Sequence, residues 1–488
     1  LKASEELLRE VDRAGVQRFP MPLLHIAQEI GGHEVMLNTA ATAAAAGLTG
    51  YSLAHLESVI RDNFQKKGQK VVDANLRVAD AAYRQAEKEY GSSFDHKLES
   101  IPGAPQRMLL NGNEAFSYGA LAAGVRFVAG YPMSPATSVL EWMADHAHEY
   151  GLIMKETEDE ISAICMAIGA GHVGARAMVS TSGGGFSLMV EALGYAGMAE
   201  IPVVIYEAQR PGPSTGLPTR HEQSDLMFAL WASQGEFPRL VLTPGTVEEA
   251  FEAGHRAFNL AEKYQTPVIV LSDHFLATSA RTVEMDAFDL DQVVIERGKL
   301  LTNEELDAMA GEYLRYAPTE DGISPRALPG HPKAVYSAEG NEHYAHSGIA
   351  EAAAARFEQH SKRMRKLETA RGDVRPPKHY GPAGAPLTLI GWGSTVGPAL
   401  EALKLLNARQ PVAEYWHIVD AWPFPTEAMV DILSTAQSVI VVEGNQMGQM
   451  ARLITQETGF KIENRLLKYD GRPFSPEQIA NWCVGGAR

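Results

Sequence analysis

Short runs of valine and isoleucine alternate with longer stretches of helical character along most of this chain. Four of these runs are VRFVAG (125–130), IPVVIYEAQ (201–209), TPVIVLSD (266–273) and SVIVVEG (438–444). Strands that are apolar on both sides are typical of parallel sheets covered by helices on both faces. The alternation therefore predicts an α/β fold, and ligands on such sheets bind beyond the carboxyl ends of the strands.

Changes of pattern divide the 488 residues into four predicted regions. Residues 1–100 are rich in helical periodicity, and we interpret them as a small α/β domain, or half of one, that ends in a polar linker. Residues 108–285 form the first strand–helix region, and residues 386–488 form a second one. Between them, residues 286–380 are polar and punctuated by proline and glycine, which predicts a connecting arm or insertion.

The net charge of −17 argues against nucleic acid and against an anionic membrane surface as partners, because both attract an excess of lysine and arginine. Net charge describes only the field far from the protein, so it leaves room for a local basic pocket. No apolar run is long enough to span a bilayer, and no signal peptide is visible. The chain starts at Leu1, already within a helix-like pattern, so we expect that further sequence precedes it.

The two cysteines, Cys165 and Cys483, form no CxxC pair. This chain alone is therefore not expected to hold an iron–sulfur cluster or a cysteine-rich zinc site. Cys165 stands among isoleucine and methionine, which predicts a small buried hydrophobic residue. So few cysteines fit a reducing cytoplasm.

The stretch from Lys155 to Phe186 joins a carboxylate-rich helix start to a glycine-rich turn. Thr157 and Glu160 have the spacing of a capping box, with Thr157 as the N-cap residue. The functional alternative is a carboxylate held near the apolar Ile161 and Ile164, where burial tunes its affinity for a proton. Spacing alone favours the cap.

Two glycine-rich turns follow predicted strands. Ser182–Gly185 resembles a phosphate cradle, but no lysine follows it, and it matches neither a P-loop nor a GxGxxG motif. Gly391–Gly397 could bind an anion at a helix start, and a tight turn between a strand and a helix explains it equally well.

The loop QRPGPSTGLPT (209–219) is the most constrained segment of the chain. Its prolines fix φ, and its glycines allow close approach of the backbone. A rigid loop that presents Arg210, Ser214 and Thr215 is suited to hold a carboxylate or a phosphate by charge-assisted hydrogen bonds, so we favour a functional role. The pair Asp273–His274 could be catalytic, but a structural histidine is the favoured interpretation.

Taken together, the motifs of this chain resemble the α subunit of 2-oxoacid:ferredoxin oxidoreductases. The resemblance runs in order from about residue 108 to the C-terminus. The first hundred residues look like the C-terminal part of the γ domain of that family, a fusion similar to its 2-oxoglutarate branch. The motifs are GNEAFSYGALAAGVRFVAGYPMSPATSV, ETEDEISAICMAIGA, STSGGGFSLMVEALGYAGMAEIPVVI, QRPGPSTGLPT, EQSDL, DGISPRALPG, NEH (341–343) and EGNQMGQM (443–450).

The resemblance implies a thiamine diphosphate enzyme. It implies a pyrimidine-binding parallel-sheet domain, a transketolase C-terminal-like α/β domain and a partial γ domain. Glu160 matches the glutamate that bonds the aminopyrimidine ring and so activates the cofactor, which carries the chemistry. A separate β subunit is expected to supply the diphosphate site, Mg²⁺ and a 4Fe–4S cluster, with coenzyme A as co-substrate and ferredoxin as electron partner.

The resemblance also assigns the remaining site residues. Ser134 stands where the family usually has threonine, so a hydroxyl near the substrate is kept. Arg210 is our choice for gripping the substrate carboxylate, together with Ser214 and Thr215, and a hold on a second, distal carboxylate is a hypothesis. Ala136 and Gly184 replace a common serine and a common proline, which affects substrate fit more than reaction class. The cofactor is expected to meet Glu160, Ser182, Gly183, Tyr131 and Pro132.

These expectations lead to one predicted function with two alternatives. The chain is predicted to be the α subunit of a cytoplasmic (αβ)₂ 2-oxoglutarate:ferredoxin oxidoreductase. Such an enzyme forms succinyl-CoA by oxidative decarboxylation or runs the reverse reductive carboxylation. Pyruvate or broad 2-oxoacid specificity is the alternative within the class. A non-catalytic scaffold or acyl-CoA-binding subunit is the alternative from another class.

Overall fold

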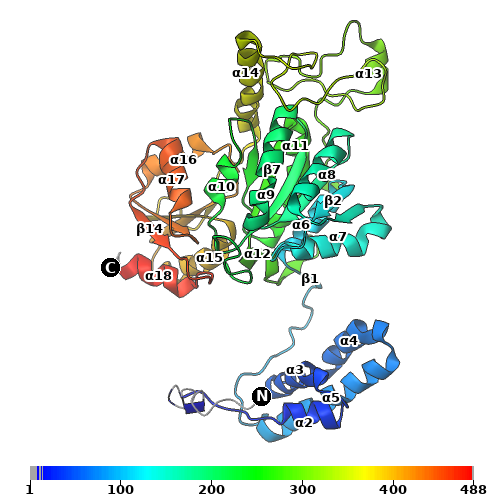
Figure 1. Ribbon diagram of the computed structural model, residues 1–488. Helices are drawn as coiled ribbons and strands as arrows, with labels where there is room; N and C mark the ends of the chain where they lie inside the picture. Colours follow the sequence, from blue (N-terminus) through cyan, green and yellow to red (C-terminus); the bar gives the residue numbers. More distant parts are fainter. Residues whose placement is uncertain (1–7, 10–12, 14, 486–488) are drawn as a thin grey trace. The chain divides into compact units, whose positions relative to one another are not determined.

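The computed structural model describes residues 8–9, 13 and 15–485, and the chain divides after Pro105 into two compact units (Figure 1). The described part of the first unit contains helices and no strand. Its helices approach closely because the side chains of the alanine-rich apolar stretch are small: a Cβ at Gly47 would lie 2.3 Å from the carbonyl oxygen of Tyr83. The elements are α2 (Leu23–Glu29), η1 (Glu34–Met36), α3 (Leu37–Thr49), α4 (Leu53–Phe64), η2 (Gln65–Lys67) and α5 (Gln69–Tyr90).

The second unit is built around a seven-stranded sheet with the order β12-β6-β7-β5-β4-β2-β3. Every pairing in it is parallel except that of β12 with β6. The central strands β4, β5 and β7 are buried along their whole length, as their uninterrupted apolar runs predict. The strands are β2 (Phe127–Gly130), β3 (Ile153–Glu156), β4 (Ala177–Thr181), β5 (Val203–Gln209), β6 (Leu240–Leu242), β7 (Pro267–Asp273) and β12 (Asp420–Trp422).

Helices cover both faces of this sheet, which confirms the predicted α/β class (Figure 1). One face packs against α6 (Gly112–Ala122), α7 (Thr137–Tyr150), α11 (Val247–Tyr264) and α12 (His274–Thr278). The other packs against α8 (Glu160–His172), α9 (Gly183–Ala199) and α10 (Leu226–Trp231). A short antiparallel ribbon joins β1 (Arg107–Leu110) to β8 (Arg281–Glu284). No helix in the described part of the chain is both long and apolar enough to cross a membrane.

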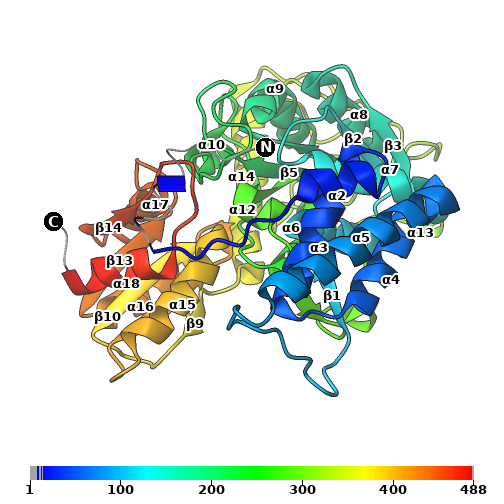
Figure 2. The same ribbon diagram turned by 90° about the horizontal axis from the view of Figure 1, so that it is seen from below.

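A second sheet of five strands, β14-β13-β10-β11-β9, lies within residues 378–467. Only β9 runs antiparallel to its neighbour. Figure 2 shows α15 and α18 side by side on this sheet, while α16 and α17 join the core of the first sheet. The elements are β9 (Lys378–Tyr380), β10 (Leu387–Trp392), η5 (Gly393–Thr395), α15 (Val396–Leu406), β11 (Ala413–Ile418), α16 (Thr426–Thr435), β13 (Ser438–Glu443), α17 (Gln449–Thr458), β14 (Asn464–Leu467) and α18 (Pro476–Gly485).

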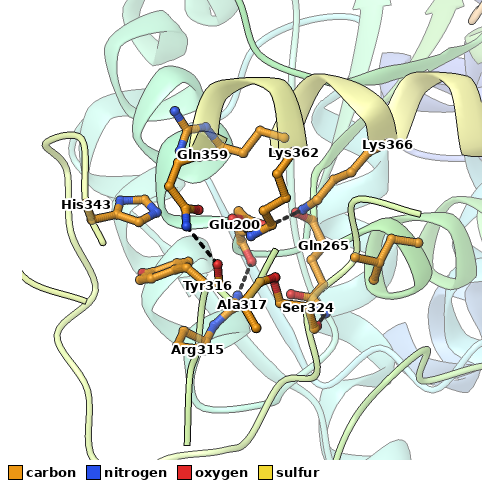
Figure 3. Close-up of polar contacts among 12 residues, drawn as sticks. Glu200, Gln265, Arg315, Tyr316, Ala317, Ser324, His343, Gln359, Lys362 and Lys366 are labelled. Atoms are coloured by element: carbon orange, nitrogen blue, oxygen red, sulfur yellow. Dashed lines mark hydrogen bonds and ion pairs between the residues drawn. The ribbon is translucent and has the colours of Figure 1, made fainter. Parts of the chain in front are cut away.

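Between the sheets, the chain is mostly irregular up to the long helix α14 (Ala353–Ala370), with only η3 (Leu290–Gln292) and α13 (Asn303–Ala308) before it and η4 (Arg371–Asp373) after it. A buried carboxylate, Glu200 at the end of α9, anchors α14 (Figure 3). Lys362 Nζ lies 2.5 Å and Lys366 Nζ 2.6 Å from its oxygens, and Arg315 donates to its backbone carbonyl. Burial alone would raise the pKa of Glu200, but these cations outweigh burial and hold that pKa far below its ordinary value.

We expect Glu200→Gln to lower the free energy of unfolding by about 3 kcal/mol, because it leaves buried cations without their counter-charge. Chemical denaturation of the chain measures this change. The matched control is Glu358→Gln, a glutamate on the exposed side of α14, which should shift stability by less than about 0.5 kcal/mol. Equal stability of the two variants would contradict the role of Glu200.

Candidate active site

Every residue predicted for the site follows one of four adjacent parallel strands, β3, β2, β4 and β5. Because the carboxyl ends of parallel strands meet at one edge of a sheet, the fold gathers these residues at that edge. The residues are Tyr131, Pro132 and Ser134 after β2, Glu160 after β3, Ser182 and Gly183 after β4, and Arg210, Ser214 and Thr215 after β5.

The carboxylate cluster that opens α8 is capped differently from the predicted capping box. Asp159 is the N-cap residue, and its Oδ1 accepts a hydrogen bond of 2.7 Å from the backbone N–H of Ser162. The Thr157 hydroxyl instead donates to the carbonyl of Asp159. Glu160 is therefore the first residue of the helix, and its carboxyl is not used as a cap.

The Glu160 side chain is only 3% exposed, and its Oε1 atom has no hydrogen-bond partner among the described residues. Burial raises its pKa, so this carboxyl holds a proton more readily than one in water. A buried, unpaired carboxyl oxygen is costly unless something else satisfies it. The ring nitrogen of the aminopyrimidine in thiamine diphosphate is a group that fits a hydrogen bond with Glu160 Oε1.

The three glycines at the start of α9 face three different groups. A Cβ at Gly185 would lie 2.4 Å from Glu160 Oε1, and one at Gly183 would lie 2.4 Å from Asp225 Oδ2. A Cβ at Gly184 would meet nothing closer than 3.8 Å, with Ser214 and Met133 as its neighbours. Two carboxyl groups thus flank this helix start, which corrects its interpretation as a phosphate cradle because carboxylates repel phosphate.

Arg210 links two of the loops at this edge. Its Nη1 donates a hydrogen bond of 2.7 Å to the backbone carbonyl of Ser134, so the loops after β5 and β2 are tied together. Burial lowers the pKa of Arg210, yet arginine keeps its charge in proteins. After this one hydrogen bond, the guanidinium of Arg210 has further N–H donors that can bind a carboxylate.

The predicted residues form an open surface more than an enclosed pocket. Tyr131 is 41% exposed, and Ser134, Ser214 and Thr215 are exposed as well. In contrast, Ser182 is fully buried, and its hydroxyl has no partner among the described residues. The site therefore presents a buried polar floor and an uncovered rim.

Asn113 supports the candidate site and was not predicted from the sequence. Its side-chain amide donates to the carbonyl of Pro135 at 2.8 Å and to the hydroxyl of Ser138 at 2.7 Å, and it accepts from the hydroxyl of Tyr206. These contacts fix the loop that carries Ser134. No local signal could reveal them, because the partners are far apart in the sequence.

The second glycine-rich turn, Gly391–Gly397, already contains an anion from the chain itself. Asp273 Oδ2 accepts hydrogen bonds of 3.0 Å from the backbone N–H of Ser394 and from the side chain of Gln223. Asp273 also caps α12. The alternative of a free anion site is therefore wrong, and Asp273 is a structural residue that joins the two sheets.

Cys165 was predicted to be buried, but it is exposed. It lies on the outward face of α8 with Ile161 and Met166, which are 50% and 42% exposed. The inward face of the helix is filled by Ala163, Ile164, Ala167 and Ile168. Among the described residues, no group of three or more His, Cys, Asp or Glu side chains could hold a metal ion.

The fold and this edge define the class of an α/β protein with a candidate ligand site at the carboxyl ends of its parallel strands. The family described as "Pyruvate flavodoxin/ferredoxin oxidoreductase, thiamine diP-bdg" matches residues 118–366. A second family, "Pyruvate ferredoxin/flavodoxin oxidoreductase", matches residues 3–85. The chain thus combines segments of two families of the same enzyme group.

Curated relatives and a solved structure agree with these matches. The chain is 39% identical to the 2-oxoacid:ferredoxin oxidoreductase 1 α subunit of Aeropyrum pernix, over 88% of this chain and 68% of the relative. It is 34% identical to the 2-oxoglutarate synthase subunit KorA of Methanothermobacter marburgensis, over 78% of this chain and 99% of that one.

The solved structure is a 2-oxoglutarate:ferredoxin oxidoreductase from Magnetococcus marinus with 2-oxoglutarate, coenzyme A and succinyl-CoA bound. It matches with a TM-score of 0.88 and 34% identity, over 96% of this chain and 81% of that chain. The chain belongs to the family of 2-oxoacid:ferredoxin oxidoreductase α subunits, and it is an oxidoreductase subunit.

Proposed function

We propose that this chain is the α subunit of a 2-oxoglutarate:ferredoxin oxidoreductase. The observation that carries the proposal is the buried carboxyl of Glu160, whose Oε1 lacks a partner among the described residues at the edge shared by four strands. The relative named for 2-oxoglutarate and the solved structure with 2-oxoglutarate bound support this substrate. In the forward direction, 2-oxoglutarate and coenzyme A give succinyl-CoA, CO₂, one proton and two electrons.

Thiamine diphosphate, when bound, supplies the nucleophile for the 2-oxo carbon and the electron sink for decarboxylation. Glu160 would share a proton between Oε1 and the pyrimidine ring nitrogen, and its burial keeps water from competing for that proton. Ser182, Gly183, Tyr131 and Pro132 would line the cofactor.

Arg210 would hold the carboxylate of the substrate next to the hydroxyl of Ser134. Ser214 and Thr215 lie exposed on the same loop as Arg210, within a few residues of it. We assign them to the distal carboxylate that distinguishes 2-oxoglutarate from pyruvate. This assignment is part of the proposal and is tested with it.

The residues at the rim of the candidate site are exposed, which supports the inference that a partner subunit covers them. We propose a β subunit that carries the diphosphate site, Mg²⁺ and a 4Fe–4S cluster, in an (αβ)₂ assembly that passes electrons to ferredoxin. The two free cysteines favour a reducing compartment such as the cytoplasm.

One observation favours a second candidate, a broad 2-oxoacid specificity. The Aeropyrum relative is named for 2-oxoacids in general and not for 2-oxoglutarate. The αβ complex should therefore be assayed for dye reduction with coenzyme A and either 2-oxoglutarate or pyruvate. We expect kcat/KM to be at least about tenfold higher for 2-oxoglutarate. Equal values would establish the broad specificity, and a preference for pyruvate would refute the proposal.

Replacing Arg210 by alanine should raise the KM for the 2-oxoacid about 10- to 100-fold, because a charge-assisted bond to the substrate carboxylate is lost. Steady-state kinetics of the αβ complex measure this effect. Arg220→Ala serves as the control, since Arg220 is an exposed arginine of the same loop. An unchanged KM in Arg210→Ala would remove Arg210 from the substrate site.

A further inference from the structure

Two motifs of the chain, EQSDL (222–226) and EGNQMGQM (443–450), have no assigned part in the proposed reaction. The first motif ends the loop between β5 and α10, and the second joins β13 to α17 in the region of the second sheet. The fold brings the two motifs into direct contact, with α10 beside α17 (Figure 1). The contact between them indicates what both motifs do.

Gln223 lies at the centre of this contact and is fully buried. Its Oε1 accepts a hydrogen bond of 2.9 Å from the backbone N–H of Gly444, and its own backbone N–H donates to the Gly444 carbonyl at 2.7 Å. Its carbonyl accepts from the side-chain amide of Asn445 at 3.0 Å. Its side-chain amide donates to Asp273 Oδ2 and to the carbonyl of Trp392. Every polar group of Gln223 therefore has a partner, as a buried amide requires.

Gln449, the first residue of α17, makes a second contact with the loop. Its side-chain amide donates to the carbonyl of Ser224 at 2.5 Å, and its Oε1 accepts from the backbone N–H of Met227 at 2.8 Å. The backbone N–H of Gln449 donates to Asn445 Oδ1 at 3.2 Å, so the two contacts are linked. The second motif thus binds the backbone of the loop at residues 223, 224 and 227.

Glu443 fixes the shape of the second motif. It is fully buried, and its oxygens accept hydrogen bonds from the backbone N–H groups of Met450 at 2.9 Å and Ala451 at 3.1 Å. The first N–H groups of a helix have no partner within the helix, so a carboxylate is favourable there. Glu443 Oε2 also accepts from the amide of Asn445 at 2.7 Å. Glu443 therefore orients Asn445 toward the loop.

The residues bound in this way form one end of the loop that carries Arg210. The backbone N–H of Asp225 donates to Gln209 Oε1 at 3.0 Å, and Gln209 directly precedes Arg210. The loop is therefore closed at its base. Its tip, residues 212–217, is exposed. The position of the tip consequently depends on how the base is held.

We call the side chains of Gln223, Asn445 and Gln449 the interlock. We propose that the interlock positions the loop 210–219 for the 2-oxoacid, so that its three members are positioning residues of the proposed reaction. This role rests on the proposed function, whereas the contact itself does not. A buried network of hydrogen bonds favours a single arrangement of the loop, because other arrangements leave buried polar groups unpaired.

Loss of the interlock should affect the binding of the substrate and not that of the cofactor. Glu160 and Ser182 follow β3 and β4 and form no hydrogen bond with the interlock among the described residues. The loop carries Arg210, the residue proposed to hold the substrate carboxylate. A displaced base would move this guanidinium and leave the floor of the site in place.

The positioning role is tested with Asn445→Ala in the αβ complex, by dye reduction with coenzyme A and 2-oxoglutarate. We expect KM for 2-oxoglutarate to rise about fivefold or more, while kcat stays within about twofold of the wild type. The affinity for thiamine diphosphate, measured by calorimetry, should not change. Gln449→Met removes a second member of the interlock at nearly constant size and should give the same result. If Asn445→Ala does not fold, Gln449→Met decides the question.

The matched control is Thr243→Val. Thr243 is fully buried, and its hydroxyl donates to the carbonyls of Ile418 and Val419, so this variant also removes hydrogen bonds between the two sheets but none to the loop. It should lower stability and leave KM unchanged. A wild-type KM in the interlock variants, or a KM raised equally in Thr243→Val, would overturn the positioning role.

Hydrogen–deuterium exchange of the αβ complex tests the interlock without use of the reaction. The hydrogen-bonded backbone amides of Gln223, Asp225 and Met227 should exchange slowly in the wild type. Asn445→Ala should speed exchange over residues 210–227 about tenfold or more, and Thr243→Val should not. Unchanged exchange in Asn445→Ala would show that the interlock does not hold the loop. A complex that reduces dye with no 2-oxoacid would instead refute the proposed function, and the exchange result would still decide on the interlock.

Discussion

Glu160→Ala should lower the turnover of the αβ complex by about 10²- to 10⁴-fold. Glu160 is the buried carboxyl whose Oε1 has no partner among the described residues, and proton sharing with a reacting system typically contributes that much. Steady-state reduction of a dye with 2-oxoglutarate and coenzyme A measures the effect. The loss should appear mainly in kcat, because the proton is needed in the transition state more than for substrate binding.

The matched control for this prediction is Glu158→Ala. Glu158 lies two residues away in the same acidic cluster, but its side chain is exposed. It should keep nearly the full turnover. If Glu160→Ala reduced dye at the wild-type rate, the assignment of Glu160 to cofactor activation would be wrong.

Gly185→Ala should weaken the binding of thiamine diphosphate about 10- to 100-fold. The added methyl group would lie 2.2 Å from Thr181 Oγ1 and 2.4 Å from Glu160 Oε1, so the carboxyl has to move. Overpacking of this kind typically costs about 1 to 3 kcal/mol, and here the displaced group is the one that we propose to bind the cofactor. Calorimetric titration of the αβ complex with thiamine diphosphate measures the change.

Gly184→Ala is the natural control because it adds the same methyl group one residue earlier. Its nearest neighbours would be 3.8 Å away, which is ordinary van der Waals contact. Gly184→Ala should therefore bind the cofactor nearly as the wild type does. Equal affinity of the two variants would show that Glu160 is not held against Gly185.

The parts of the fold that were predicted from sequence depend on local patterns. Continuous apolar runs identified the buried strands β5, β7 and β13. Because the carboxyl ends of parallel strands share one edge, the ends of these runs also indicated where the candidate site lies. The order of the motifs and the alternation of strands and helices were sufficient to predict the strands and the sheet edge that carries the candidate site.

The polar contacts that complete the site could not be predicted in the same way. The spacing of Thr157 and Glu160 fits a capping box. The N-cap residue is nevertheless Asp159, because its carboxylate accepts a hydrogen bond from the N–H of Ser162. The side chain of Asp273 reaches Ser394 across more than a hundred residues. Such contacts depend on tertiary packing and leave no periodic signal.

The packing of the alanine-rich helices in the first unit could not be predicted either. Their small side chains let two helices approach closely. In the sequence alone, the partner helix and its register are not visible.

The most direct test of the account is the exchange of the reactive C–H proton of thiamine diphosphate with deuterium, followed by NMR in the αβ complex. We propose that Glu160 promotes the loss of that proton indirectly, through its bond to the aminopyrimidine ring of the cofactor. We predict fast exchange in the wild type and in Glu158→Gln, and exchange slower by about two orders of magnitude or more in Glu160→Gln. Exchange at the wild-type rate in Glu160→Gln would contradict the central claim that this buried carboxyl activates the cofactor.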